Sequence, residues 1–231
     1  MRWIERVWAA LACCALAGLP AVAQQAPPAP AASQARFAVV LDAAHGGDDA
    51  GGRLTNDQLE KNFTLALSVR LRSLLTARGF QVVTTRESDA TIGPNRRAEI
   101  ANHTRAQACL SLHGSGSGFG VHLFTSALTP VQPTRFTPWK TAQAAWVTRS
   151  LALAGVLNSA LLHAGMNVTL GRSSLPAVDS MTCPAVAVEV APELGSDGKV
   201  AAGLDDKDYQ AQVAEALAAA LVEWRAEASQ P

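Results

Sequence analysis

This sequence has few charged residues and no excess of either sign. Only 16% of the 231 residues are charged, and 19 basic and 19 acidic residues cancel to a formal net charge of zero. With 48% hydrophobic residues, such a chain folds around a core rather than staying disordered. Lysine and arginine do not cluster in the sequence, so no basic surface is predicted. This argues against a nucleic-acid partner and against an electrostatic membrane anchor.

The sequence also lacks an apolar run long enough for a comfortable membrane span. The apolar stretch at residues 7–19 is short, follows Arg2 and Arg6, and precedes an Ala-Val-Ala sequence at residues 21–23. This pattern is typical of a cleaved signal peptide. We therefore expect export to the periplasm or full secretion, with an uncleaved anchor as the alternative.

The predicted signal peptide covers residues 1–23. Residues 24–35 are rich in Ala, Pro and Gln and indicate a flexible tether. Residues 36–228 then form the expected folded domain, with no stable membrane anchor once the signal is removed. We expect this domain to be a monomer.

Cysteine is scarce as well. Two of the four cysteines fall in the predicted signal peptide, which leaves Cys109 and Cys183. Both lie in apolar, strand-like surroundings, which favours buried free thiols. Export to an oxidising compartment keeps a disulfide as the alternative, because sequence does not show whether the two residues come within bonding range.

From Arg36 onward, short apolar runs alternate with helical patterns. The predicted strands are residues 37–41, 81–85, 108–112, 121–125 and 185–190. The predicted helices are residues 60–78, 96–102, 141–164 and a final one through 209–224. This alternation predicts a single α/β domain with a largely parallel, twisted sheet of about five to six strands and helices on both faces.

Three side chains that could carry chemistry follow predicted strands. His45, His113 and Glu189 each lie at or just past a strand end, where open α/β sheets bind their ligands. Glu60 opens a predicted helix. Two histidines and one carboxylate suit a catalytic zinc site, which keeps a fourth position open, and their wide spacing argues against a structural zinc.

The pattern around these residues resembles a known family. The segments are Asp42-Ala-Ala-His45-Gly-Gly, Glu60-Lys-Asn, Thr85-Arg-Glu-Ser-Asp, Arg97-Ala-Glu-Ile-Ala-Asn, Ser111-Leu-His113, Gly120-Val and Pro184-Ala-Val-Ala-Val-Glu189-Val. In order and spacing they resemble the zinc-dependent N-acetylmuramoyl-L-alanine amidases of amidase type 3, the class that includes the bacterial cell-separation amidases. The resemblance covers about residues 36 to 225.

The resemblance implies a phosphorylase/hydrolase-like fold and one Zn²⁺ per chain, held by His45, Glu60 and His113. Glu189 matches the family's catalytic glutamate, and Glu193 is the fallback base. The implied reaction cleaves the amide between the lactyl group of N-acetylmuramic acid and L-alanine, in cell wall remodelling or cell separation. Peptidoglycan is then the partner.

Three arginines are candidates for substrate binding. Arg86 and Arg97 match family positions and would meet substrate carboxylates or hold the fold through ion pairs. Arg172 stands in a more loosely matching segment.

The chain departs from the family's usual pattern at Ala44, at Gly114-Ser115 and over residues 190–194. These departures bear on substrate preference, and the peptidoglycan type stays open. A zinc peptidase or carboxypeptidase acting on another amide is one alternative function. A peptidoglycan-binding protein with weakened catalysis is another.

Some relatives carry an inserted helix that plugs the metal site. Residues 119–171 indicate one strand and one long helix, so we expect an open groove. Whether an activator protein is needed stays open.

Overall fold

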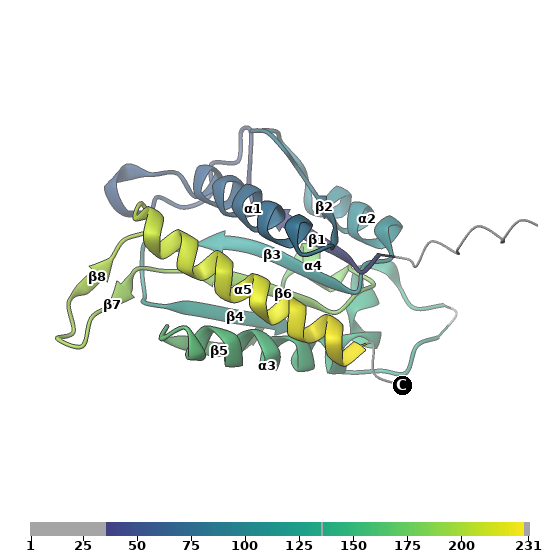
Figure 1. Cartoon of the computed structure of the whole chain (residues 1–231). Coiled ribbons are helices and arrows are strands. Elements are labelled where there is room, and N and C mark those ends of the chain that lie inside the picture. Colours follow the sequence, from purple (N-terminus) through teal and green to yellow (C-terminus); the bar gives the residue numbers. More distant parts are fainter. Residues whose placement is uncertain (1–35, 135, 229–231) are drawn as a thin grey trace, which may run out of the picture. The chain divides into compact units, whose positions relative to one another are not determined.

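The computed structural model describes residues 36–134 and 136–228, so the predicted signal peptide and tether lie outside the described residues. The main sheet has six strands in the order β2-β1-β3-β6-β4-β5 (Figure 1). Their bounds are β1 Ala38–Ala43, β2 Gln81–Thr84, β3 Ala108–Gly114, β4 Val121–Ser126, β5 Val168–Ser173 and β6 Ala185–Val190. Neighbouring strands are parallel except β4 and β6, which run antiparallel. The predicted largely parallel α/β sheet is confirmed.

Helices cover both faces of this sheet, as predicted. Three long helices, α1 (Glu60–Ala77), α3 (Val147–His163) and α5 (Lys207–Ala228), pack with one face into the larger hydrophobic core (Figure 1). The shorter α2 (Pro94–Thr104) and α4 (Pro176–Asp179) lie with the other face. The short helices leave part of that second face open for a site.

The second face changes character along the strands. At the amino ends its side chains are apolar and buried with α2 and α4: Val40, Cys109 and Ala185. Two residues further on, the paired positions are Asp42, Ser111 and Ala187. Two residues beyond, His113 pairs with Glu189 at the carboxyl ends. Because side chains alternate across a strand, these rows share one face, which becomes polar as it approaches the strand ends.

Two elements, one strand and one helix, differ from the sequence-based prediction. β5 is missing from the prediction because it is a largely exposed edge strand that contains Gly171 and no sustained alternation. The predicted helix at residues 141–164 is broken: a 3₁₀ segment, η2 (Trp139–Ala145), precedes α3 and is bent from it by 65°. Trp146, between them, has φ −114°, well away from the value of about −63° in an α-helix.

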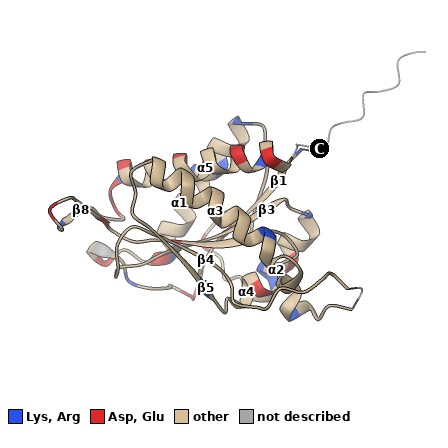
Figure 2. Ribbon diagram, turned by 90° about the horizontal axis from the view of Figure 1, so that it is seen from below, with Lys and Arg blue, Asp and Glu red and all other residues tan. Residues whose placement is uncertain are grey.

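Smaller elements complete the chain. A 3₁₀ turn, η1 (Thr55–Asp57), precedes α1, and strands β7 (Glu193–Leu194) and β8 (Val200–Ala202) form a separate antiparallel pair. No single helix within the described ranges is long and apolar enough to cross a membrane, although η2 and α3 together pass that test by length and composition. Lys and Arg are spread along the ribbon rather than gathered on one element (Figure 2).

The two cysteines form a disulfide, so the expectation of free thiols was wrong. Cys109 and Cys183 have an S–S distance of 2.08 Å and a Cα–Cα distance of 6.3 Å. The reason is strand pairing: Cys109 lies in β3 opposite Ala185 of β6, and Cys183 comes two residues before Ala185. The bond therefore ties together the amino ends of the two strands whose carboxyl ends carry His113 and Glu189.

Candidate metal centre

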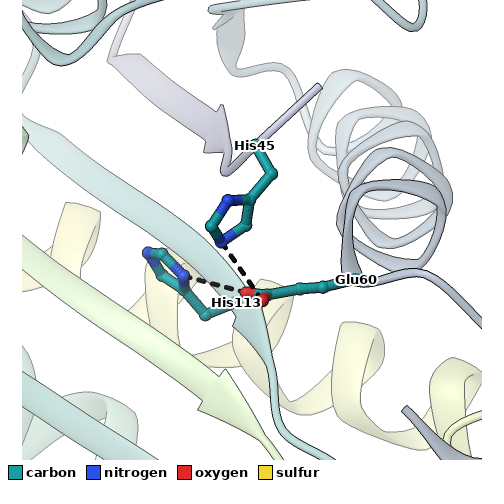
Figure 3. Close-up of side chains that lie close together, drawn as sticks. All are labelled: His45, Glu60 and His113. Carbon is teal, nitrogen blue, oxygen red and sulfur yellow. Dashed lines mark hydrogen bonds and ion pairs between the residues drawn. The ribbon is translucent and has the colours of Figure 1, made fainter. Parts of the chain in front are cut away.

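Three of the predicted site residues meet at the carboxyl end of the sheet. His45 follows β1, Glu60 is the first residue of α1, and His113 lies near the end of β3 (Figure 3). One nitrogen or oxygen atom from each lies within 4.8 Å of the other two. The two imidazole rings are nearly perpendicular, with centroids 5.7 Å apart. The structure thus brings together the ligand set that the sequence predicts.

The backbone around His45 is shaped to bring its ring to Glu60. His45 has φ 61°, and Gly51 has φ 65°, a left-handed conformation that glycine adopts without steric penalty. A Cβ atom at Gly51 would lie 2.7 Å from His45 Cδ2 and 2.8 Å from Glu60 Oε2. Glycine at this position therefore leaves room for the cluster.

Glu60 is held as an ionised carboxylate. Its Oε2 lies 3.1 Å from His45 Nε2 and accepts a hydrogen bond from the Gly52 amide. Its Oε1 lies 3.1 Å from His113 Nδ1 and accepts from the Gly114 amide. Burial raises the pKa of Glu60, but these hydrogen bonds and the charge of His45 outweigh it and lower the pKa to about 2.

Other side chains engage the remaining nitrogen of each ring. His45 Nδ1 lies 2.9 Å from Asp49 Oδ2, and this hydrogen bond is the main reason that the pKa of Asp49 is lowered. His113 Nε2 lies 3.4 Å from Ser111 Oγ, which donates to Asp42. Partners of this kind fix the tautomer of a metal-binding histidine. They leave His45 Nε2 and His113 Nδ1 facing Glu60.

Sequence reasoning assigned no role to Asp49 or Ser111. Ser111 could have been found from its spacing to His113, because residues i and i+2 of a strand share a face. Asp49 gave no such signal. It reaches His45 through a tight turn that begins with the pairing of Gly46 and Asp49.

Arg97 and Arg86 lie buried beneath the cluster. Arg97 donates to Asp42 Oδ1 at 2.6 Å and to the carbonyl of His45 at 2.7 Å. Arg86 donates to the carbonyl oxygens of Ala43, Ala44 and Lys61, and its burial, with the charge of Arg97 nearby, lowers its pKa. Arg97 thus forms an ion pair with Asp42, whereas the contacts of Arg86 are hydrogen bonds to uncharged oxygens.

Glu189 stands beside the cluster on the neighbouring strand. It pairs with His113 across β3 and β6. Both side chains line a hollow of about 300 Å³, and His113 also lines a second hollow of about 280 Å³ between α2 and α4. The described residues offer the Glu189 carboxylate no hydrogen bond or ion pair. It is therefore available to a substrate or a water molecule.

Two other candidates lie elsewhere. Glu193, the fallback base, accepts a hydrogen bond from Asn167 in the β7 region. Arg172 pairs with Thr125 and donates to the carbonyl oxygens of Ser126 and Leu128. Strand alternation from Gly171, which pairs with Phe124 on the site face, puts Arg172 on the opposite face. The structure does not bring either side chain to the cluster.

Comparison with known proteins assigns the chain to a family. The family model described as N-acetylmuramoyl-L-alanine amidase matches residues 39–223, which include all three clustered residues and Glu189. The chain belongs to the N-acetylmuramoyl-L-alanine amidase family. The predicted family resemblance is confirmed.

Individual members of the amidase family support this assignment. The germination-specific N-acetylmuramoyl-L-alanine amidase of Bacillus subtilis is 34% identical over 89 residues, which cover 32% of this chain and 37% of that protein. An N-acetylmuramoyl-L-alanine amidase of Mycobacterium tuberculosis is 33% identical over 147 residues, covering 61% and 59%. The chain thus spans less than two thirds of either curated relative. The catalytic domain of the amidase CwlV from Bacillus (Paenibacillus) polymyxa has the same fold, with a TM-score of 0.63, 24% identity and coverage of 82% of this chain and 98% of that one.

Proposed function

We propose that this protein is a zinc-dependent N-acetylmuramoyl-L-alanine amidase, which cleaves the amide between the lactyl group of N-acetylmuramic acid and L-alanine in peptidoglycan. The observation that carries the proposal is the meeting of His45, Glu60 and His113 beside Glu189 in a member of this family. The reaction would serve cell wall remodelling or cell separation.

The donor set fits one zinc ion. His45 Nε2, His113 Nδ1 and a carboxylate oxygen of Glu60 are the donors, and His-rich sets with one carboxylate are common at catalytic zinc. Asp49 and Ser111 hold the other ring nitrogens, as expected around a metal. Zinc bound there would polarise the scissile carbonyl and make a nucleophilic water available near neutral pH.

Glu189 would move the protons of the reaction. Its carboxylate takes the proton of the attacking water and delivers a proton to the leaving amide nitrogen, which departs as the amine of L-alanine. Two features support this role: the pairing of Glu189 with His113 and the absence of a competing partner among the described residues. The lining of a shared hollow gives the substrate access to both groups.

Paired variants test the assignment of ligand and base. Glu60→Ala should lose tight zinc binding and activity together, whereas Glu189→Gln should keep one zinc per chain and lose at least about 100-fold in kcat. Glu193→Gln is the matched control and should behave like the wild type. Zinc is measured by elemental analysis and turnover on a soluble muropeptide. If the Glu60 and Glu189 variants contained equal zinc, whether both kept it or both lost it, the ligand assignment would be refuted.

Reaction products separate the alternatives. An amidase frees the stem peptide with L-alanine at its amino terminus, whereas a zinc peptidase or carboxypeptidase leaves that residue on the glycan. A wall-binding protein with weakened catalysis would sediment with peptidoglycan and release nothing. The intact ligand set and Glu189 favour turnover over binding alone.

Export is part of the proposal. Residues 1–23 would act as a signal peptide and residues 24–35 as a tether, which delivers the domain to the periplasm or the exterior. The Cys109–Cys183 disulfide supports this, since such bonds persist in oxidising compartments. Among the described residues between 119 and 171, none belongs to the metal cluster, which supports an open groove whose activity does not require a helix to be displaced.

A further inference from the structure

His122 extends the row of functional side chains across the sheet. It lies in β4 and pairs with Glu189 of β6, which pairs in turn with His113 of β3. Directly paired residues on neighbouring strands point their side chains to the same face. The order on that face is therefore metal-cluster histidine, Glu189, and His122.

The imidazole of His122 reaches towards the carboxyl end of the sheet. A Cβ atom at Gly118, in the loop between β3 and β4, would lie 3.2 Å from His122 Nε2. The ring also stacks with Phe124, with centroids 6.4 Å apart and planes at 29°. Phe124 lines the same hollow as Glu189 and His113. His122 is thus held at the border of the reaction site.

His122 has hydrogen-bonding capacity that the protein leaves unused. The other four histidines each have a hydrogen bond or an ion pair: His45, His103, His113 and His163. Within the described residues His122 has neither, although it is half-buried. A half-buried polar group without a protein partner is most simply explained if a water or a ligand satisfies it.

The order of the row indicates which part of the substrate would reach His122. In the proposed reaction the scissile carbonyl lies at the metal cluster, and the leaving nitrogen lies where Glu189 can protonate it. The peptide begins at that nitrogen. Neighbouring strands are about 4.8 Å apart, and an extended peptide advances about 3.4 Å per residue. His122, which follows Glu189 in the row, therefore lies level with the first or second residue of the bound peptide.

No cationic side chain competes with His122 for this position. The hollow shared by His113 and Glu189 has no lysine or arginine in its lining. Arg97 lines the other hollow, but its guanidinium already donates to Asp42 and to backbone carbonyls. A neutral imidazole can donate one hydrogen bond from either nitrogen.

We propose that His122 is a substrate-binding residue for the peptide half of the substrate, donating a hydrogen bond to a carbonyl or carboxylate oxygen in the first two residues after the scissile amide. This inference rests on the proposed amidase function. It assigns His122 no part in metal binding or proton transfer.

Binding to an inactive protein tests the proposal without turnover. The full-length Glu189→Gln protein, loaded with zinc, would be titrated calorimetrically with N-acetylmuramoyl-L-alanyl peptide. Adding His122→Ala should weaken binding about tenfold, the effect of losing one hydrogen bond to a strongly accepting group. His122→Gln should recover part of the loss. His163→Ala, at the exposed end of α3, is the matched control and should leave binding unchanged.

Competition experiments identify the half of the substrate involved. Free stem peptide should inhibit the wild-type enzyme, and the inhibition constant should rise about tenfold in His122→Ala. Inhibition by a peptide-free N-acetylmuramic acid saccharide should not change. A loss of saccharide inhibition alone, or unchanged binding of both fragments in a folded, zinc-loaded variant, would overturn the proposal.

The same variants keep this inference separate from the proposed function. If Glu189→Gln retains turnover, the proposed mechanism fails whatever His122 does. If Glu189→Gln is inactive and binds substrate equally with and without His122, only the role of His122 is wrong.

Discussion

Reduction of the Cys109–Cys183 disulfide should strongly destabilise the domain. The bond joins residues 74 positions apart. In the chain-entropy model, releasing a loop of that length returns about 15 cal/mol/K to the unfolded chain, or about 4.5 kcal/mol at 25 °C. Loss of native disulfides typically costs about 2–5 kcal/mol, so we expect a loss of about 4 kcal/mol in the free energy of unfolding.

Urea unfolding measures this loss directly. With a slope of about 2 kcal/mol per molar urea, a loss of 4 kcal/mol lowers the midpoint by roughly 2 M. Both samples should contain a chelator, because zinc bound only by the folded state would add its own stabilisation. The Cys109→Ala/Cys183→Ala protein should unfold like the reduced wild type. A midpoint shift below about 0.5 M, with both thiols shown free by titration, would refute the loop-closure reasoning.

Three further predictions concern the metal cluster. Ser111→Ala removes the partner of His113 Nε2 and should weaken zinc binding about 10–100-fold while the fold is kept; competition with a zinc chelator measures this, and an unchanged affinity would contradict the role of Ser111. Gly51→Ala should abolish tight zinc binding, because the new Cβ would collide with His45 and Glu60. Gly198→Ala is the control and should keep zinc, since φ is also positive there but no atom lies within 4 Å of the new Cβ. Equal zinc loss in both variants would mean that the effect comes from backbone strain and not from the contact. The folded-state pKa of Glu60, about 2, lies below its ordinary value of 4.5, so the metal-free protein keeps this stabilisation above pH 4.5 and loses it as the pH falls towards 2. Urea midpoints across that range should fall less steeply in Glu60→Gln than in the wild type, and parallel curves would contradict the prediction.

The sequence predicted the helices and strands whose buried apolar residues recur at regular spacing. Helix α1 shows apolar residues at one-face spacing, and Leu67 and Leu71 are fully buried. Strands β3 and β6 are central and buried, so they appear as continuous apolar runs. The edge strand β5 has no such pattern, because only one of its sides has a strand neighbour and its side chains are largely exposed.

The site also has features that the sequence predicted and features that only the structure revealed. Residue types and family resemblance were enough to nominate His45, Glu60 and His113, which the structure brings together. The disulfide and the contacts of Arg97 depend on strand pairing and on three-dimensional proximity, which the spacing along the chain does not encode. For the same reason the row that places His122 next to Glu189 emerged only with the antiparallel pairing of β4 and β6.

The position of the cleaved bond is the most direct test of the central claim. Purified peptidoglycan would be digested by the mature, zinc-loaded protein in ¹⁸O-labelled water, and the fragments analysed by mass spectrometry. The proposed reaction places one ¹⁸O atom in the lactyl carboxylate of the glycan and none in the peptide, which begins with an unlabelled L-alanine. The label should disappear when a chelator is present and return with added zinc. Label in a peptide carboxylate, with L-alanine still on the glycan, would contradict the amidase assignment.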